Sequence, residues 1–179
     1  MPNSSAEHLF LEFSAKKLRQ FASRIHVCLE KLNDEQIWLR AGDHSNAVGN
    51  LCLHLAGNVR QWIMHGVAGQ PDLRHRDEEF AARGHVAKDE LWQRLNAAVQ
   101  EACTILEQTP SEDLTRIIRP QNYDVTVMEG IYHVVEHFAQ HTGQILYATK
   151  ALSGDDLGFY RHLTGASAPP PPPAGQETP

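Results

Sequence analysis

The chain has 179 residues, 21% of them charged, a formal net charge of −6 and 11 histidines. This length allows one domain with its own core, and an acidic chain without long runs of like charge is not expected to bind nucleic acid. The N-terminus lacks a basic stretch followed by an apolar core, and no apolar run approaches the ~18 residues of a membrane span. We therefore expect neither a signal peptide nor a membrane partner.

The three cysteines, Cys28, Cys52 and Cys103, are far apart in the sequence and form no CxxC pair. An odd number of cysteines at such spacing disfavours a disulfide framework, and free thiols are typical of a reducing compartment. We therefore expect a cytoplasmic protein.

The first predicted helix spans residues 6–32, where apolar side chains recur at the spacing of an amphipathic face. Ser4 or Ser5 can cap this helix, and residues 35–40 can add a short turn after it.

A second helix is predicted to begin after Asn46 or Ser45, which can cap it, and to end at Gly66. Its apolar face is formed by Leu51, Leu55, Val59 and Trp62. A polar stripe adjoins that face and contains Asn50, His54, Asn58 and Gln61. His54 lies at the edge of the apolar sector, so its side chain is expected to point into the protein.

Residues 66–84 form a long polar connection, and connections of this length are often functional or carry a short helix. The third long helix covers residues 88–108. Residues 111–125 are irregular, with a short extended piece at 116–119. A fourth helix includes residues 131–150, and Asp124 or Thr126 can cap it.

The fourth helix carries His133, His137 and His141 four residues apart, which stacks them on one face. His137 and His141 can bind one divalent ion from neighbouring turns. His133 and His141 lie roughly 12 Å apart at ~1.5 Å per residue, too far to share an ion that sits ~2 Å from each nitrogen. A further ligand must come from another helix, and His54 is the candidate.

Three histidines bind zinc, nickel or iron and leave a position for water or substrate, as catalytic sites do. The bound water could act as nucleophile or base, or the metal could keep a substrate thiol deprotonated. The competing interpretation is a set of hydrogen-bonded core histidines, because HxxxH pairs arise by chance in a histidine-rich chain. Phe138 stands where a zinc protease of the HExxH type has glutamate, which disfavours that class.

Other polar residues share the histidine stripes and have two interpretations each. Asn50, Asn58 and Gln144 can orient the ligands by hydrogen bonds, or they can simply join helices. His133 is either such a partner or a surface residue. Gly143, inside the fourth helix, predicts a close approach of another helix.

Charged residues in the connections offer further candidates. Arg40, Arg74 and Arg76 could attract an anionic substrate, although solvated loop charges are more common. Asp77 and Glu78 are general-base candidates by elimination only, so no catalytic residue is assigned.

Four long helices without convincing strands predict an all-α protein, an antiparallel four-helix bundle with at least one long connection. We place this domain at residues 1–163. Residues 164–179 are proline-rich, lack core-forming side chains, and are expected to form a disordered or polyproline II tail.

Three sequence runs carry a resemblance to a known family: SNAVGNLCLHLAGNVRQWI, RDEEFAARG and YHVVEHFAQHTGQILYATK. They resemble the DinB/YfiT-like metalloenzyme superfamily, and more narrowly its branch known as the domain of unknown function 1572. The resemblance covers residues 6–160, and its paired motifs NLxxHLxGNxRQW and HxxxHxGQI are specific. It implies a bundle with up-down-down-up connectivity, a homodimer, and a metal triad at His54, His137 and His141.

The resemblance also implies a divalent ion, zinc or nickel first and iron or manganese next. Characterised relatives include bacillithiol transferases and a mycothiol-dependent maleylpyruvate isomerase, and others are known as damage- or stress-induced genes. By analogy we expect a metal-dependent transferase that activates a low-molecular-weight thiol toward a small electrophile. The alternatives are a metal-assisted hydrolase and a non-catalytic, stress-related metal-binding bundle.

Overall fold

The computed structural model describes residues 5–163, so the predicted tail at 164–179 and the candidate cap Ser4 lie outside the described residues. The predicted all-α class is confirmed, because long helices make up most of the described chain. They are α1 (Ala6–Lys31), α3 (Val48–Val59), α5 (Lys88–Gln108) and α6 (Val127–Ser153). Among these residues, no helix combines the length and apolarity needed to cross a membrane.

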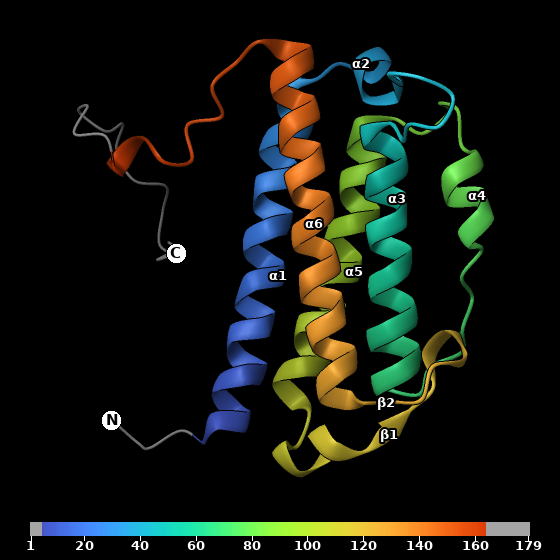
Figure 1. The fold of residues 1–179 in the computed structure, drawn as a ribbon, viewed down its shortest axis with the longest axis vertical. Coiled ribbons are helices and arrows are strands. Elements are labelled where there is room, and N and C mark those ends of the chain that lie inside the picture. Colours follow the sequence, from blue (N-terminus) through green and yellow to red (C-terminus); the bar gives the residue numbers. More distant parts are fainter. Residues whose placement is uncertain (1–4, 164–179) are drawn as a thin grey trace.

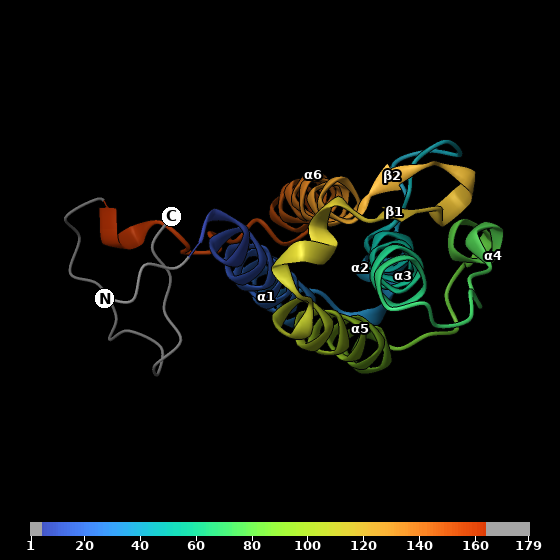
Figure 2. The ribbon, with the colours of Figure 1, turned by 90° about the horizontal axis from the view of Figure 1, so that it is seen from below.

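The long helices stand side by side, with α1 and α6 running upward and α3 and α5 running downward in Figure 1. The chain therefore has to return along the whole bundle between α3 and α5, and residues 68–87 make this crossover. The short helix α4 (Arg76–Ala81) lies in the crossover, outside the bundle and next to α3 (Figure 2). This confirms the expectation of a long connection that either is functional or carries a helix of its own.

Apolar side chains from all the long helices fill the bundle. The fully buried ones include Leu18, Ile25, Leu55, Leu95 and Phe138. Helix α1 packs against α5 and α6, and α3 packs against α5 and α6. Burial of this apolar surface supplies the main driving force for folding, and it fixes which faces of α3 and α6 meet.

Side-chain caps explain where α1 and α6 begin. The Ser5 hydroxyl accepts a hydrogen bond from the backbone N–H of His8 (3.3 Å) at the start of α1. At the start of α6, the Thr126 hydroxyl accepts from the N–H of Glu129 (3.2 Å), and the Glu129 carboxylate accepts from the N–H of Thr126 (2.7 Å). This is the reciprocal capping box.

The predicted cap of α3 was wrong. The helix begins after Ala47, which has no capping side chain, rather than after Ser45 or Asn46. Asn50, in the first turn, replaces the missing cap, because its Oδ1 accepts from the N–H of Ala47 (3.1 Å). At its other end, α3 continues as a π-helix, η1 (Arg60–Val67), past the predicted stop at Gly66.

The remaining elements are short. A turn of helix, α2 (Asp34–Trp38), follows α1, and two-residue strands, β1 (Ile117–Ile118) and β2 (Val125–Thr126), pair antiparallel below the bundle (Figure 1). Strand β1 lies within the extended piece predicted at 116–119. The 3-10 turns are η2 (Ser111–Thr115), η3 (Pro120–Asn122) and η4 (Arg161–Leu163).

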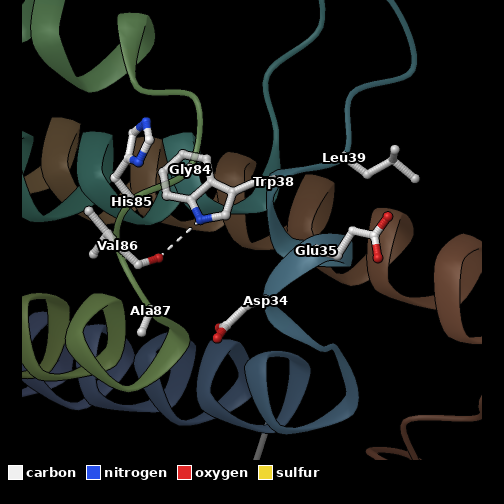
Figure 3. A pocket seen from close by; sticks show the side chains of 8 residues that line it. All are labelled: Asp34, Glu35, Trp38, Leu39, Gly84, His85, Val86 and Ala87. Atoms are coloured by element: carbon white, nitrogen blue, oxygen red, sulfur yellow. Dashed lines mark hydrogen bonds between the residues drawn. The ribbon is translucent and has the colours of Figure 1, made fainter.

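The upper end of the crossover is fastened to α2. The Trp38 Nε1–H donates to the Val86 carbonyl (3.0 Å), as Figure 3 shows, and the Asp34 carboxylate accepts from the N–H of Lys88 at the start of α5 (2.9 Å). An open cavity of about 590 Å³ lies between these segments. Its lining residues are Asp34, Glu35, Trp38, Leu39, Gly84, His85, Val86 and Ala87, so it is separate from the histidines of α3 and α6.

Candidate metal centre

Three histidines from α3 and α6 come together inside the bundle. The Nε2 atom of His137 lies 3.0 Å from Nε2 of His54 and 3.2 Å from Nε2 of His141. One ligand atom from each ring lies within 4.8 Å of the others. Two nitrogens bound about 2 Å from one tetrahedral ion lie roughly 3.3 Å apart. The spacing therefore fits three imidazoles that share one ion.

Hydrogen bonding alone explains this cluster poorly. A ring nitrogen has either one proton or one lone pair, so Nε2 of His137 cannot form an ordinary hydrogen bond with both neighbours. Its other nitrogen, Nδ1, is buried and has no hydrogen-bond partner among residues 5–163. Buried polar atoms normally have partners, so this is not a set of satisfied core histidines, and an ion at the centre would give Nε2 of His137 its missing partner.

The protonation of the cluster also suits metal binding. Burial, followed by the neighbouring histidines His141 and His54, lowers the pKa of His137 to about 3. Burial likewise lowers the pKa of His141, against a hydrogen bond to Gln144 that raises it. Both rings are therefore neutral at physiological pH, and a neutral imidazole is the form that binds a metal.

A buried ion pair determines which nitrogen of His54 faces the cluster. The Glu79 Oε2 atom lies 3.0 Å from Nδ1 of His54, and both Glu79 oxygens accept hydrogen bonds from Arg74 at 2.8 Å. Arg74 Nη2 is also 3.0 Å from Nδ1 and has a second proton to donate, but an ionised carboxylate can only accept, so its contact with Nδ1 requires a proton on that nitrogen. We therefore place the proton of His54 on Nδ1, where it donates to the Glu79 carboxylate, and this leaves the Nε2 lone pair free for an ion.

Glu79 is ionised in this arrangement. Burial by itself would raise the pKa of its carboxyl group, but the hydrogen bonds from Arg74 and His54 outweigh burial and hold the pKa below its ordinary value. The exposed fractions of the three side chains are 2% for Arg74, 10% for Glu79 and 6% for His54. Solvent therefore hardly screens the pair.

Gln144 orients the ring of His141 in a similar way. Its Oε1 atom lies 2.7 Å from Nδ1 of His141, one helical turn away on α6. With the proton on Nδ1, the lone pair on Nε2 of His141 points at Nε2 of His137. The two outer histidines thus share one tautomer, with Nε2 available at the centre.

The other candidates occupy different places. His133 packs against Trp62 with the two rings tilted and their centroids 4.1 Å apart, and its ring lies 5.5 Å from that of His137. Asn58 is buried, and its Oδ1 has no hydrogen-bond partner in the described part of the chain. Asn50 contacts the crossover and does not orient a histidine. Its amide donates to the carbonyls of Glu79 (2.8 Å) and Ala82 (3.0 Å).

Of the charged residues that the sequence offered as candidates, the structure places only one beside the histidines. Arg74 belongs to the site through Glu79, whereas Arg40 donates to the carbonyl of Phe80 (3.0 Å), and Arg76 lies over the Phe80 ring (4.9 Å). Asp77 and Glu78 are exposed. The carboxylate at the site is Glu79, which the sequence reasoning missed because three acidic residues in a row, DEE, have no periodicity that selects one of them.

The expectation for Gly143 was also wrong. A Cβ atom added there would meet nothing within 4 Å among the described residues, and the position is exposed. No helix approaches it, because it lies about 200° around α6 from His141 at ~100° per residue.

The whole described domain matches one family model. Residues 5–164 match the family described as "Protein of unknown function (DUF1572)". The chain belongs to this family. The resemblance seen in the sequence is thereby confirmed, and no curated protein matches the DUF1572 chain.

Solved structures support the DinB-like helical fold. A conserved protein from Enterococcus faecalis superposes with a TM-score of 0.68 at 19% identity, covering 80% of this DUF1572 chain and 96% of its own. A DinB-like protein, YjoA from Bacillus subtilis, superposes with a TM-score of 0.63 at 17% identity, covering 82% of this chain and 96% of its own. At these identities the likeness establishes the fold alone.

A cavity adjoins the ion pair of this DUF1572 chain. It has a volume of about 520 Å³ and lies between the crossover, α3 and α5, with Arg74 and Glu79 in its wall. Small-molecule sites commonly occupy roughly 300–1,000 Å³. The cavity therefore has the size for a small ligand beside the residues that support His54.

Proposed function

We propose that the protein binds one divalent ion through the Nε2 atoms of His54, His137 and His141. The observation that carries this proposal is the convergence of the three Nε2 atoms, with the Nδ1 atoms of His54 and His141 engaged by acceptors. Three imidazoles suit zinc or nickel, with iron or manganese as alternatives. When bound, such an ion leaves a coordination position open and lowers the pKa of a water or thiol that occupies it.

We further propose a transferase that joins a low-molecular-weight thiol to a small electrophile. The thiol loses its proton, its sulfur forms a bond to an electrophilic carbon, and the leaving group departs from that carbon. The protein's own cysteines are poor nucleophiles, because burial raises the pKa of Cys52 to about 12 and of Cys103 to about 11 and also raises that of Cys28. The reacting thiol therefore has to come from a second substrate.

No residue is assigned as a general base. Glu79 is unsuited to that role because both of its oxygens accept hydrogen bonds from Arg74. Its contribution is to hold His54, and the proton released by the thiol is expected to pass to solvent.

Turnover measurements test the proposal. Protein loaded with zinc or nickel is incubated with a chloronitroaromatic electrophile and a panel of small thiols, beside His137→Ala as the metal-free control. We expect thioether formation that needs both metal and thiol and is absent from the variant. Ester or amide cleavage without thiol would indicate a hydrolase instead. No turnover in either assay, with metal still bound, would indicate a non-catalytic metal-binding bundle.

A further inference from the structure

Gly57 marks a close contact between α3 and the crossover. It lies one helical turn after His54, and a Cβ atom added there would fall 1.9 Å from Oε1 of Glu79 and 3.0 Å from Nε of Arg74. Real Cβ atoms essentially never approach another atom closer than 3.0 Å. Glycine weakens a helix relative to alanine, yet here it leaves the space that the ion pair occupies.

The ion pair is held on several sides. Arg74 also donates through Nη1 to Oε1 of Gln61 (2.9 Å), and Gln61 in turn donates to the carboxylate of Asp72 (2.7 Å). The backbone carbonyl of Glu79 accepts from Asn50 (2.8 Å). Glu79 is therefore fixed by its main chain and by its side chain at the same time.

Polar contacts of this kind are what dock the crossover next to His54. Residues 70–78 are mostly exposed, and α4 buries only Glu79 among its six residues. A buried ion pair is stable only when both charges keep their partners. Movement of this segment away from α3 would carry Arg74 and Glu79 together, and it would break the contacts of Glu79 with His54 and Asn50 and of Arg74 with Gln61.

We infer that Glu79, clamped by Arg74, is a positioning residue for His54, and that metal binding is coupled to the docking of residues 72–82 on α3. This inference rests on the proposed metal site. The carboxylate keeps the Nδ1 proton in place and aims Nε2 at the other two histidines. Loss of such a partner typically weakens metal binding by about 10–100-fold. Coupling is reciprocal, so bound metal should favour the docked segment by the same factor.

Metal affinity, measured by competition with a chromophoric chelator for zinc, tests the inference directly. Glu79→Gln keeps an acceptor oxygen but loses the charge, and Gly57→Ala displaces the ion pair while favouring the helix. We expect both variants to bind zinc about 10–100-fold more weakly than wild type. Gly143→Ala is the matched control, a helical glycine with open space around it, and it should bind zinc as wild type does. Circular dichroism checks that each variant is folded.

Hydrogen exchange on the wild-type protein provides a test that needs no variant. Zinc should slow amide exchange in residues 76–82 by about 10–100-fold, and by more than it slows exchange in the turn at Ser111–Thr115. Equal slowing in both segments would show general stabilisation and would overturn the coupling.

The outcomes separate the two proposals. A wild-type protein that binds no zinc, nickel, iron or manganese would overturn the proposed function and this inference together. If the wild type binds metal, and Gly57→Ala and any folded Glu79→Gln bind zinc with the same affinity, this inference alone would be overturned and the metal site would remain.

Discussion

The Nδ1 atoms of the three histidines differ in their hydrogen-bond partners. Nδ1 of His54 meets a carboxylate at 3.0 Å, Nδ1 of His141 meets an amide oxygen at 2.7 Å, and Nδ1 of His137 has no partner within residues 5–163. An anionic acceptor makes an imidazole more basic than a neutral one does. We therefore expect His54 to be the strongest of the three ligands.

The weaker support of His141 gives a prediction for a single residue. Gln144→Ala removes the acceptor that fixes the His141 tautomer, and zinc affinity should fall by about tenfold. Gln140→Ala, which removes an exposed amide bound to Glu136 on the same helix, is the control. Equal affinity of the two variants in the chelator assay would show that Gln144 does not orient the ring.

At the scale of the elements, the start of α6 determines where His137 and His141 lie. The N–H of Thr126 and then its hydroxyl donate to the Glu129 carboxylate and lower the pKa of that group below its ordinary value of 4.5. A carboxyl group whose pKa is lowered by folding stabilises the fold above its unfolded pKa. That contribution is lost as the pH falls through the lower, folded value.

Thr126→Ala tests this cap. The Glu129 pKa, followed by NMR, should lie below 4.5 in the wild type and should rise in the variant. Loss of the threonine cap should also lower the free energy of unfolding by about 1 kcal/mol. Thr104→Ala, near the C-terminal end of α5, removes a hydroxyl that bonds its own helix and should leave the Glu129 pKa unchanged. A Glu129 pKa that does not respond to Thr126→Ala would contradict the capping role.

Asn50 connects α3 to the crossover through hydrogen bonds. Its buried amide makes four hydrogen bonds, accepting from Arg40 and the N–H of Ala47 and donating to the carbonyls of Glu79 and Ala82. Asn50→Ala leaves several of these donors and carbonyls without a hydrogen-bond partner, which should lower the free energy of unfolding by about 3 kcal/mol.

Chemical denaturation measures this loss. The exposed pair of Asn96 and Gln100 on α5 supplies the control, because Asn96→Ala should change stability by less than about 0.5 kcal/mol. A similar change in the free energy of unfolding for Asn50→Ala and Asn96→Ala would mean that the hydrogen bonds of Asn50 contribute little to stability.

At the scale of the whole molecule, the candidate site ties together helices that are distant in sequence. His54 and His137 are 83 positions apart, and they lie on α3 and α6, which run in opposite directions (Figure 1). A ligand that binds only the folded state stabilises it by about 2.7 kcal/mol at one hundred times its dissociation constant.

Thermal unfolding should therefore respond to metal. Zinc at that excess should raise the melting temperature of the wild type by roughly 5–10 °C, on the scale of 2–4 °C per kcal/mol for a chain of this size. His137→Ala should show no such rise. A comparable rise in the variant would indicate that zinc binds elsewhere on the protein.

The sequence predicts the regular parts of this molecule well. Helical periodicity identifies the four long helices, and α5 begins and ends at the predicted residues. Spacing brings His137 and His141 to one face, and the polar stripe brings His54 into the bundle. These features depend on contacts within one helix or on one apolar face, which a linear pattern records.

The crossover contacts escape such a pattern. Glu79 reaches His54 from 25 positions away, out of a run of three acidic residues. The need for glycine at position 57 is visible only when the Glu79 carboxylate is in place, because a Cβ atom there would clash with it. Gly143 is also a glycine inside a helix, but it faces open space. Such contacts are fixed by how the crossover docks, so they require the folded chain.

The most direct test of the central claim is an anomalous difference map from crystals of the zinc-loaded protein. We expect one strong peak about 2.0–2.1 Å from Nε2 of His54, His137 and His141, with Nδ1 of His54 still bonded to Glu79. A peak at other side chains, or zinc-loaded crystals with no peak between these three rings, would contradict the metal site.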